Sequence, residues 1–445
     1  MLSRKTFLNQ ISLAASGMLL VPGFARGGDL RKFNAIYGEG IAPFLIEGDK
    51  LIVPKATYST PDRQVVVHSR YEFEVPPADI VKVEREAIRL SKNKPSGYYT
   101  GTMLAGTKTS SIGAFHSLIA ESLVIKDSRE NVLQIGKDYL VSSPYALVGI
   151  GPDASVTPET PVYASYSFWH QRIDTVVAGP DGKVSYIKGL SKLVSPALPV
   201  IPEGYVALCN VYRPFMAASL SPLHIFPIVA TSGRSSSVNA RRIRIPDTIK
   251  KLKAGKEVKI VTWGDSIAAA GDVKPELSWP RQFAQRIKEK YPQANARFKN
   301  LAIGGSKSAQ WLNNGSYPGL RDIDPAKCRF DLVLREKPDL VVMEFLNDIV
   351  FTESELHDIY GKIKKSFDRI NTEWIIVTPS YLIPNDYNLA KMRDERPRLL
   401  DSFLREFADK NGCGLADPAA RWKRLYKEGI PYFSVFNNGF NHPNE

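Results

Sequence analysis

The stretch Val258-Lys259-Ile260-Val261-Thr262-Trp263-Gly264-Asp265-Ser266 is an apolar, β-branched run that stops abruptly at Gly-Asp-Ser. β-branched residues favour strands, and a helical pattern follows, so the run predicts a strand of a parallel sheet. Ser266 then lies at the carboxyl end of that strand. Ligands collect at this edge of open α/β sheets, because loops and helix N-termini meet there. Ser266 is therefore the first candidate nucleophile.

Strands and helices alternate through the rest of the chain beyond residue 255. One helix is expected to begin at Ser278, and another is expected to begin at a capping box of Thr352 and Glu355. A third is expected to end at Asn411-Gly412. Further strands are expected at 297–303, 339–345, 374–377 and 414–416. This alternation predicts a doubly wound α/β domain over residues 246–445.

Residues 28–245 have a different character, with short β-rich runs broken by Gly, Pro, Asn and Asp. Residues 162–168 alternate with period two, and 173–177 and 184–187 flank a Gly-Pro-Asp-Gly turn, which is a hairpin signal. The region predicts an all-β, sandwich-like domain that ends after the polar stretch 232–237. Its aromatic residues predict either a sugar-stacking platform or core and interface packing: Tyr98, Tyr99, Tyr163, Tyr166, Trp169 and Tyr186.

The first 27 residues have the pattern of an export signal. Arg4 and Lys5 precede a short apolar stretch at 11–21, and small residues follow it. Ser-Arg-Lys-x-Phe-Leu resembles a twin-arginine signal with Lys5 in place of the second arginine. The apolar stretch is too short for a comfortable membrane span. We expect an exported protein, periplasmic or extracellular, without stable membrane insertion.

Composition narrows the class of protein further. The chain has 445 residues, of which 43% are hydrophobic and 24% charged, as in an ordinary globular protein. The net charge of +13 is spread along the chain without a nucleic-acid reader motif, so we expect no nucleic-acid partner. Cys209, Cys328 and Cys413 lie far apart in no metal-like spacing and are expected to be buried. No metal or cofactor is expected.

Three more candidate positions are expected at the same sheet edge as Ser266. Gly305 follows the second expected strand, Asn347 follows the third, and His442 lies in a C-terminal loop that could fold back over this edge. A serine nucleophile needs a base and oxyanion donors, and these residue types supply both. Each also has a structural explanation: Ser266 as a helix cap, Gly305 and Asn347 as turn residues, and His442 as an exposed tail residue.

On these four positions the chain resembles the SGNH hydrolases, the GDSL esterase superfamily, from about Lys256 to the end. The resemblance implies a flavodoxin-like three-layer domain in which Ser266 attacks an ester and His442 is base and then acid. It also implies an oxyanion hole of the Ser266 and Gly305 N–H groups and the Asn347 amide. The Gly-x-Ser-x-Gly elbow of the α/β-hydrolases does not occur.

Two positions depart from the family pattern. Phe345 occupies the usual glycine place of the third block, so its ring must crowd the substrate or turn into the core. Gly439 occupies the place of the acid, three residues before His442. The histidine could be oriented by Asn438 or a backbone carbonyl, which we favour, or by an acid from elsewhere such as Asp348 or Asp386; alternatively, activity is reduced. Because the family commonly continues into a closing helix, we expect the sequence to be truncated at its C-terminus.

A β-rich domain before an SGNH domain resembles the arrangement of two-domain bacterial carbohydrate esterases. The expected function is removal of short acyl groups, O-acetyl first, from a polysaccharide or oligosaccharide through an acyl-serine. The alternatives are a lipid or aryl esterase, a sugar O-acyltransferase, and a catalytically impaired glycan-binding protein.

Overall fold

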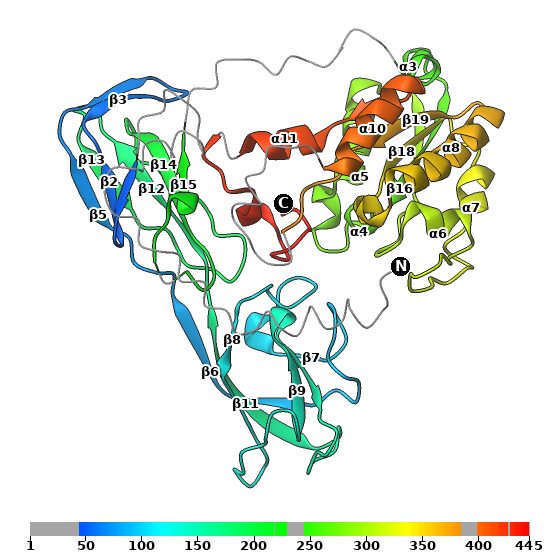
Figure 1. Ribbon diagram of the computed structural model, residues 1–445. Helices are drawn as coiled ribbons and strands as arrows, with labels where there is room; N and C mark the ends of the chain where they lie inside the picture. Colours follow the sequence, from blue (N-terminus) through cyan, green and yellow to red (C-terminus); the bar gives the residue numbers. More distant parts are fainter. Residues whose placement is uncertain (1–43, 218, 229–243, 384–397, 426–427, 445) are drawn as a thin grey trace.

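The computed structural model describes residues 44–217, 219–228, 244–383, 398–425 and 428–444. The C-terminal part contains a five-stranded sheet of order β17-β16-β18-β19-β20, in which every pair of neighbours is parallel (Figure 1). The bounds are β16 Glu257–Gly264, β17 Asn295–Asn300, β18 Leu340–Glu344, β19 Glu373–Val377 and β20 Gly414–Ala416. All five predicted strands are confirmed, although β17 ends three residues earlier than expected.

Helices cover both faces of this sheet, which is the expected doubly wound arrangement. The side chains of β16 alternate between the two faces: Val261 and Trp263 join one hydrophobic cluster, and Val258 and Ile260 join another. The first face packs against α6 Ser308–Leu312, α7 Phe330–Arg335, α8 Glu353–Arg369 and α10 Leu399–Lys410. The second face packs against α3 Pro246–Lys253 and α5 Trp279–Lys290.

Local signals account for the helix ends. Thr352 accepts a hydrogen bond from the Glu355 backbone N–H, and the Glu355 carboxylate accepts from the Thr352 N–H at 2.8 Å, which confirms the capping box of α8. Asn411 and Gly412 follow the end of α10 as expected, with Gly412 at φ +66°.

Strand order reverses at β16, because β17 lies on one side of it and β18 on the other. The loops after these strands therefore diverge and leave a crevice at their carboxyl ends, where ligands bind in such sheets. The helix α4 (Ser266–Ala269) starts at this point. The fold thus places the loop with Ser266 at the switch point of the sheet.

The region before residue 228 consists of mostly antiparallel strands in small sheets. One group of sheets contains β1 Leu45–Glu47, β2 Lys50–Val53, β3 Ala56–Ser59, β4 Gln64–Val67, β5 Tyr71–Glu74, β12 Arg172–Ala178, β13 Val184–Ile187, β14 Val206–Arg213 and β15 Ile225–Pro227. A second group contains β6 Ile80–Arg89, β7 Thr102–Met103, β8 Leu118–Lys126, β9 Tyr139–Ser142, β10 Leu147–Ile150 and β11 Pro161–Trp169.

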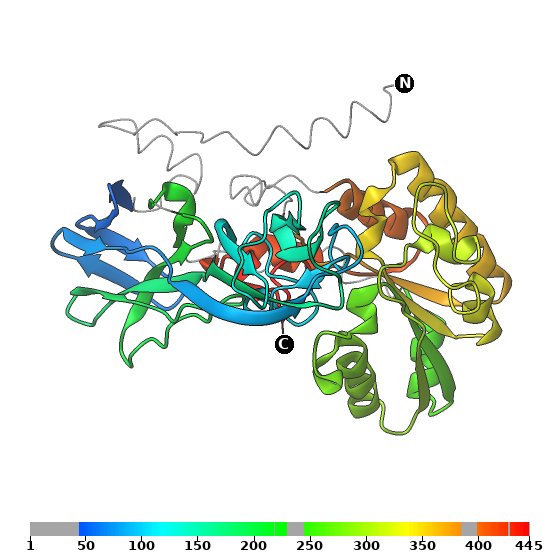
Figure 2. The same cartoon turned by 90° about the horizontal axis from the view of Figure 1, so that it is seen from below.

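These two groups have separate hydrophobic cores and form two lobes in Figures 1 and 2. The predicted hairpin is confirmed, since β12 pairs antiparallel with β13 across the Gly-Pro-Asp-Gly turn. The period-two stretch is also confirmed, because β11 alternates between buried and half-buried residues. The predicted all-β class of this region is therefore correct.

A third cluster joins the two parts of the chain. It combines Ile112, Phe115, Tyr145, Leu147, Ile173, Tyr212 and Phe226 of the β region with Ile383, Trp422, Tyr432, Phe433, Phe436 and Phe440. Figures 1 and 2 show the C-terminal segment, in red, between the β lobes and the α/β sheet. The segment that carries His442 is thus enclosed by both parts of the molecule.

Several predictions concern residues outside this description. The export signal at 1–27 and the linker at 232–237 are not among the described residues. The linker is flanked by β15, which ends at Pro227, and by α3, which begins at Pro246, and the boundary near residue 245 stays a prediction. Among the described helices, none has the length and apolar character needed to cross a membrane. All three cysteines are buried and unpaired, as expected.

Candidate active site

The Gly-Asp-Ser turn is held in place by contacts between β16 and β18. A Cβ at Gly264 would lie 2.0 Å from the backbone oxygen of Glu344, so only glycine allows the two strands to approach this closely. Asp265 is fully buried, and its carboxylate accepts the N–H groups of Ile267 (3.1 Å) and Asn347 (2.9 Å). Burial raises the pKa of Asp265 to about 6, although these two hydrogen bonds lower it. The first two residues of the motif therefore build the turn that presents Ser266.

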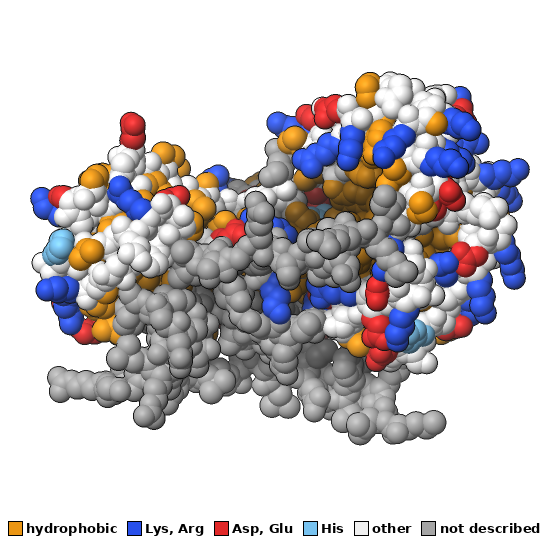
Figure 3. Space-filling view, turned by 90° about the horizontal axis from the view of Figure 1, so that it is seen from above, with side chains coloured by type: hydrophobic (Ala, Val, Ile, Leu, Met, Phe, Trp, Pro, Cys, Tyr) orange, Lys and Arg blue, Asp and Glu red, His pale blue; other side chains and the backbone are white. Residues whose placement is uncertain are grey.

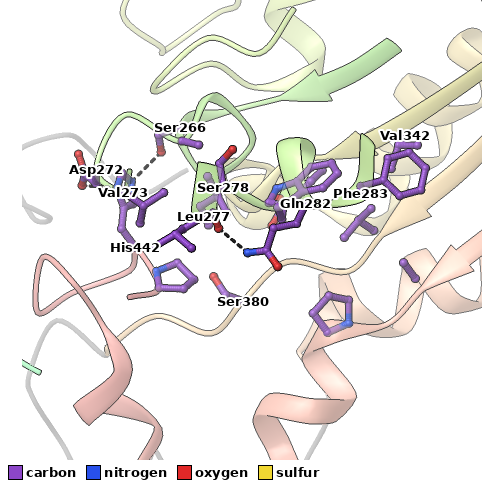
Figure 4. Close-up of a pocket in the computed structure, with 18 of the residues that line it drawn as sticks. Ser266, Asp272, Val273, Leu277, Ser278, Gln282, Phe283, Val342, Ser380 and His442 are labelled. Carbon is purple, nitrogen blue, oxygen red and sulfur yellow. Dashed lines mark hydrogen bonds and ion pairs between the residues drawn. The ribbon is translucent and has the colours of Figure 1, made fainter. Parts of the chain in front are cut away.

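The structure brings His442 to Ser266. The imidazole Nε2 lies 2.8 Å from the Ser266 Oγ, across 176 positions of sequence. Figure 4 shows both side chains at one end of a groove, with Asp272 beside them. A serine hydroxyl in hydrogen-bond reach of an imidazole has the geometry of a nucleophile and its base.

Asp272 faces the other nitrogen of the same ring. Its Oδ2 lies 2.5 Å from His442 Nδ1, and both side chains are mostly buried, at 14% and 13% exposure. Burial raises the pKa of Asp272, but the hydrogen bonds from His442 and Ser111 outweigh it, so the pKa lies below its ordinary value. The carboxylate therefore stays ionised and orders the imidazole with Nδ1 protonated and Nε2 facing the serine.

The favoured hypothesis, that Asn438 or a backbone carbonyl orients His442, is wrong, and the alternative of an acid from elsewhere in the chain agrees with the contact of Asp272. Asn438 Oδ1 accepts the backbone N–H groups of Phe440, Asn441 and His442 at 3.0–3.1 Å, so it shapes the loop and does not contact the imidazole. Asp348 is buried beneath the site, where it accepts hydrogen bonds from Ser308 and Tyr360, and burial raises its pKa to about 7.

Asp386 lies outside the described residues. Sequence reasoning missed Asp272, whose one signal was its place six residues after Ser266, in the loop that leaves the same strand end.

Gly305 and Asn347, which the sequence predicts as oxyanion donors, line a cavity on one side of Ser266. Gly305 has φ +76°, a conformation that glycine adopts without strain. The Asn347 Nδ2 donates to the Ser306 carbonyl at 3.2 Å, which fixes the amide and uses one of its two N–H groups. In the part of the chain that the structure describes, no protein acceptor faces the N–H groups of Ser266 and Gly305. Three donors are thus available next to the serine.

Phe345 turns into the core. Its side chain is 1% exposed and lies edge-on to Trp263, with ring centroids 5.1 Å apart. The bulky residue in the usual glycine place therefore does not crowd the site, because its ring packs within the hydrophobic cluster on the α8 face of the sheet.

Two cavities flank the Ser266–His442 pair. The polar cavity, of about 640 Å³, is lined by Tyr98 and Tyr99 of the β region and by charged residues such as Lys307 and Arg321. The apolar groove, of about 450 Å³, runs from Ser266 past Leu277 and Phe283 toward Val342 of the sheet (Figure 4). Tyr98 and Tyr99 are 41% and 67% exposed, whereas Tyr166 is buried in the core of its lobe. The predicted aromatic set is therefore partly exposed beside Ser266 and partly buried, and its use as a sugar-stacking platform stays a prediction.

Figure 3 shows Lys and Arg side chains scattered over the visible face, with acidic side chains between them. Among the described residues, no group of three or more His, Cys, Asp and Glu side chains could hold a metal ion.

Comparison with known proteins relates the C-terminal part to a family. Residues 262–445 match the model of the GDSL-like Lipase/Acylhydrolase family. The predicted fold class, an SGNH-like α/β domain after a β-rich region, is confirmed. No curated protein matches the chain.

Solved structures of low identity are similar to parts of the chain. A two-domain esterase (CEX) active on acetylated mannans is 20% identical, with a TM-score of 0.36 over 45% of this chain and 48% of its own. TesA is 22% identical, with a TM-score of 0.26 over 35% of this chain and 76% of its own. LAE5, from the metagenome of Lake Arreo, Spain, is 18% identical, with a TM-score of 0.31 over 42% of this chain and 87% of its own. The chain spans about half the length of the two-domain esterase.

Proposed function

We propose that the protein is a serine carboxylic ester hydrolase that works through an acyl-serine intermediate. The observation that carries this proposal is the continuous line of hydrogen bonds from Ser266 Oγ through the His442 imidazole to Asp272. His442 takes the serine proton as Oγ attacks the ester carbonyl, and Asp272 stabilises the imidazolium that forms. The imidazolium then gives its proton to the departing alcohol.

The negative oxygen of the tetrahedral intermediate needs fixed donors. In this proposal, they are the N–H groups of Ser266 and Gly305 and the Asn347 amide, each worth about 3 kcal/mol in a site without bulk water. Water then attacks the acyl-serine with His442 again as base. If a sugar hydroxyl takes the place of this water, the acyl group is transferred to the sugar. Product analysis with a sugar acceptor distinguishes this acyl transfer from hydrolysis.

The substrate we favour is a short acyl ester, O-acetyl first, of a polysaccharide or oligosaccharide. The polar cavity beside the oxyanion donors supports it, because a sugar needs many hydrogen-bonding partners and an aromatic face on which to stack. Tyr99 offers such a face at 67% exposure. We also propose export of the protein, on the pattern of its first 27 residues.

A second candidate substrate is an ester with a longer aliphatic or aryl acyl group. The observation that favours it is the apolar groove, whose Trp279, Phe283 and Trp422 side chains exceed the needs of an acetyl group. A catalytically impaired glycan-binding protein has less support, because the acid that the sequence seemed to lack is supplied by Asp272.

Hydrolysis of p-nitrophenyl esters tests the reaction. We expect Ser266→Ala to lose at least a thousand-fold in kcat while its circular dichroism stays that of the wild type. A series from acetyl to dodecanoyl separates the substrates: a rate highest for acetyl supports the carbohydrate ester, and a steep rise with chain length supports the second candidate.

The physiological substrate is tested by release of acetate from acetylated polysaccharides, beginning with acetylated mannan. The same polymer after chemical deacetylation is the control. Turnover that persists in Ser266→Ala would contradict the proposed mechanism.

A further inference from the structure

The β region contacts the acid of the triad directly. Ser111 Oγ donates to Asp272 Oδ2 at 2.7 Å, and Ser110 Oγ lies 3.4 Å from the same oxygen. This oxygen is also the one that faces His442 Nδ1. A residue 161 positions before Asp272 thus takes part in the hydrogen-bond network of the active site.

The loop that carries Ser111 is tightly held. Thr109 Oγ1 donates to the Ile112 carbonyl at 2.6 Å, and the Ala114 N–H donates to the Thr107 carbonyl at 2.7 Å. A Cβ at Gly113 would lie 2.0 Å from the backbone oxygen of Tyr145, so the loop lies directly against its neighbour. Because these contacts lie within the β region, the Ser111 hydroxyl has a defined position before it meets Asp272.

The same region also holds the loop of His442. Phe440 packs against Tyr98, Phe115 and Tyr145, with ring centroids 5.6, 5.2 and 6.2 Å apart. Ser195 Oγ donates to the Phe436 carbonyl at 2.6 Å. The amide of Asn437, which belongs to the C-terminal segment, donates to the backbone oxygen of Asp272 in the loop after α4. The acid and the base are therefore placed relative to each other by contacts that include the β region.

We propose that the β region completes the active site, with Ser111 as the positioning residue that orients Asp272 toward His442. This inference rests on the proposed function. It assigns to the β region a role in turnover itself, in addition to any part in binding the substrate.

The chemistry supports a role for this hydroxyl. A carboxylate can rotate about its Cβ–Cγ bond, and a second donor on Oδ2 removes that freedom, so His442 keeps one orientation. The Ser111 hydrogen bond also helps to keep the Asp272 carboxylate ionised. The titratable groups that bear on Asp272 are His442 of the C-terminal segment and Tyr99 of the β region. Loss of the hydroxyl should therefore let the carboxylate turn and take up a proton at higher pH.

The experiment compares Ser111→Ala with Ser110→Ala and Ser111→Thr in the full chain. For Ser111→Ala we expect kcat for p-nitrophenyl acetate to fall about ten-fold with little change in KM, the loss typical of a hydrogen bond to a charged group. The pH profile of kcat should also differ from that of the wild type. Ser111→Thr, which keeps a hydroxyl, should restore both, and Ser110→Ala should stay within about two-fold of wild type because its contact is longer.

A measurement that does not need turnover separates this inference from the proposed function. The proton between His442 Nδ1 and Asp272 gives a downfield resonance in the proton NMR spectrum, and it should shift or broaden in Ser111→Ala alone. An unchanged resonance with unchanged kcat would overturn the inference. Equal losses in Ser110→Ala and Ser111→Ala, with unaltered pH profiles, would also overturn it, because the loop would then act only as a structural element. A wild type without Ser266-dependent turnover would overturn the proposed function, while the resonance would still decide the role of Ser111.

Discussion

The backbone of Gly439 excludes an aspartate at the place where the family carries its acid. Gly439 has φ +70°, and a Cβ there would lie 2.5 Å from Val194 Cγ1. A side chain would need both a strained left-handed backbone and displacement of Val194. Asp272 reaches the imidazole from a different segment of the chain, the loop after α4. Asp272 can therefore contact the imidazole as a carboxylate without the backbone strain that an aspartate at position 439 would have.

Asp272→Asn should lower kcat by about a thousand-fold or more, because an amide neither stabilises the imidazolium nor enforces the tautomer with Nε2 unprotonated. The measurement is kcat for an activated acetyl ester, with folding checked by circular dichroism. Asp322→Asn is the matched control, since Asp322 is an exposed acid of the polar cavity and should leave kcat nearly unchanged. Similar effects of the two changes would contradict the assignment.

Placing the acid at the family position should not rescue the enzyme. In an Asp272→Asn background, Gly439→Asp is expected to recover no activity and to lower the melting temperature, because of the positive φ and the contact with Val194. Activity and thermal unfolding of the double variant check this. Recovery to more than a tenth of wild-type kcat would show that the loop adapts and that the strain argument is wrong.

Asn347→Ala should lower kcat/KM by about a hundred-fold or more, because one oxyanion donor is lost. The Asn347 backbone N–H still reaches Asp265, so the turn should keep its shape. Asn313→Ala is a suitable comparison, since its amide also donates to a backbone carbonyl, at 2.7 Å, and it lines neither cavity. Equal kinetics of both variants would remove Asn347 from the oxyanion site.

Among the elements, the junction between β20 and α11 (Pro418–Leu425) contains a partly buried ion pair between Arg405 and Asp417. Asp417 accepts two hydrogen bonds from Arg405 at 2.9 and 3.0 Å and one from Thr378 at 2.7 Å. Burial raises the pKa of Asp417, but these hydrogen bonds lower it further than burial raises it, so the pKa lies below its ordinary value. The folded state therefore favours the ionised carboxylate.

The sign of the pH dependence follows from that lowered pKa. The stabilisation by Asp417 is present above the pKa of the unfolded chain, about 3.9, and is lost as the pH falls through the folded pKa. Asp417→Asn should cost about 1–3 kcal/mol of unfolding free energy at pH 7 and less at pH 3. Denaturant unfolding at both pH values tests this, with Asp358→Asn, an exposed partner of Lys362, as control. A cost that does not depend on pH would contradict the ion-pair argument.

In the whole molecule, the cluster around Phe440 links stability to activity. Phe440 is 5% exposed between the β region and the C-terminal segment, two residues before His442. Its aromatic contacts reach three residues of the β region. The base of the triad is therefore held by packing that neither part of the chain provides alone.

Phe440→Ala should lower the unfolding free energy by about 3–5 kcal/mol, as for a large cavity in a core, and should also lower kcat because the His442 loop loses its support. Phe403→Ala in the core of the α/β sheet is the control. It should be similarly destabilising, yet its kcat per folded molecule should match that of the wild type. If both variants lose kcat equally, packing at Phe440 has no special relation to the site.

The sequence by itself determined the elements of the C-terminal part and four of its candidate residues. Period-two runs, capping residues and turn residues act over a few positions, so the five parallel strands, the α8 capping box and the hairpin of the β region were predictable. Ser266, Gly305 and Asn347 follow strand ends, and parallel strands bring their carboxyl ends to one edge.

Only the tertiary structure decided what completes the site. Asp272 meets His442 across 170 positions and Ser111 across 161, and neither contact leaves a periodic signal in the chain. The position of Phe345 in the core and the division of the β strands into two lobes likewise depend on which faces pack together. Contacts between distant segments depend on loop closure and side-chain packing, and a local pattern in one segment carries no information about its distant partner.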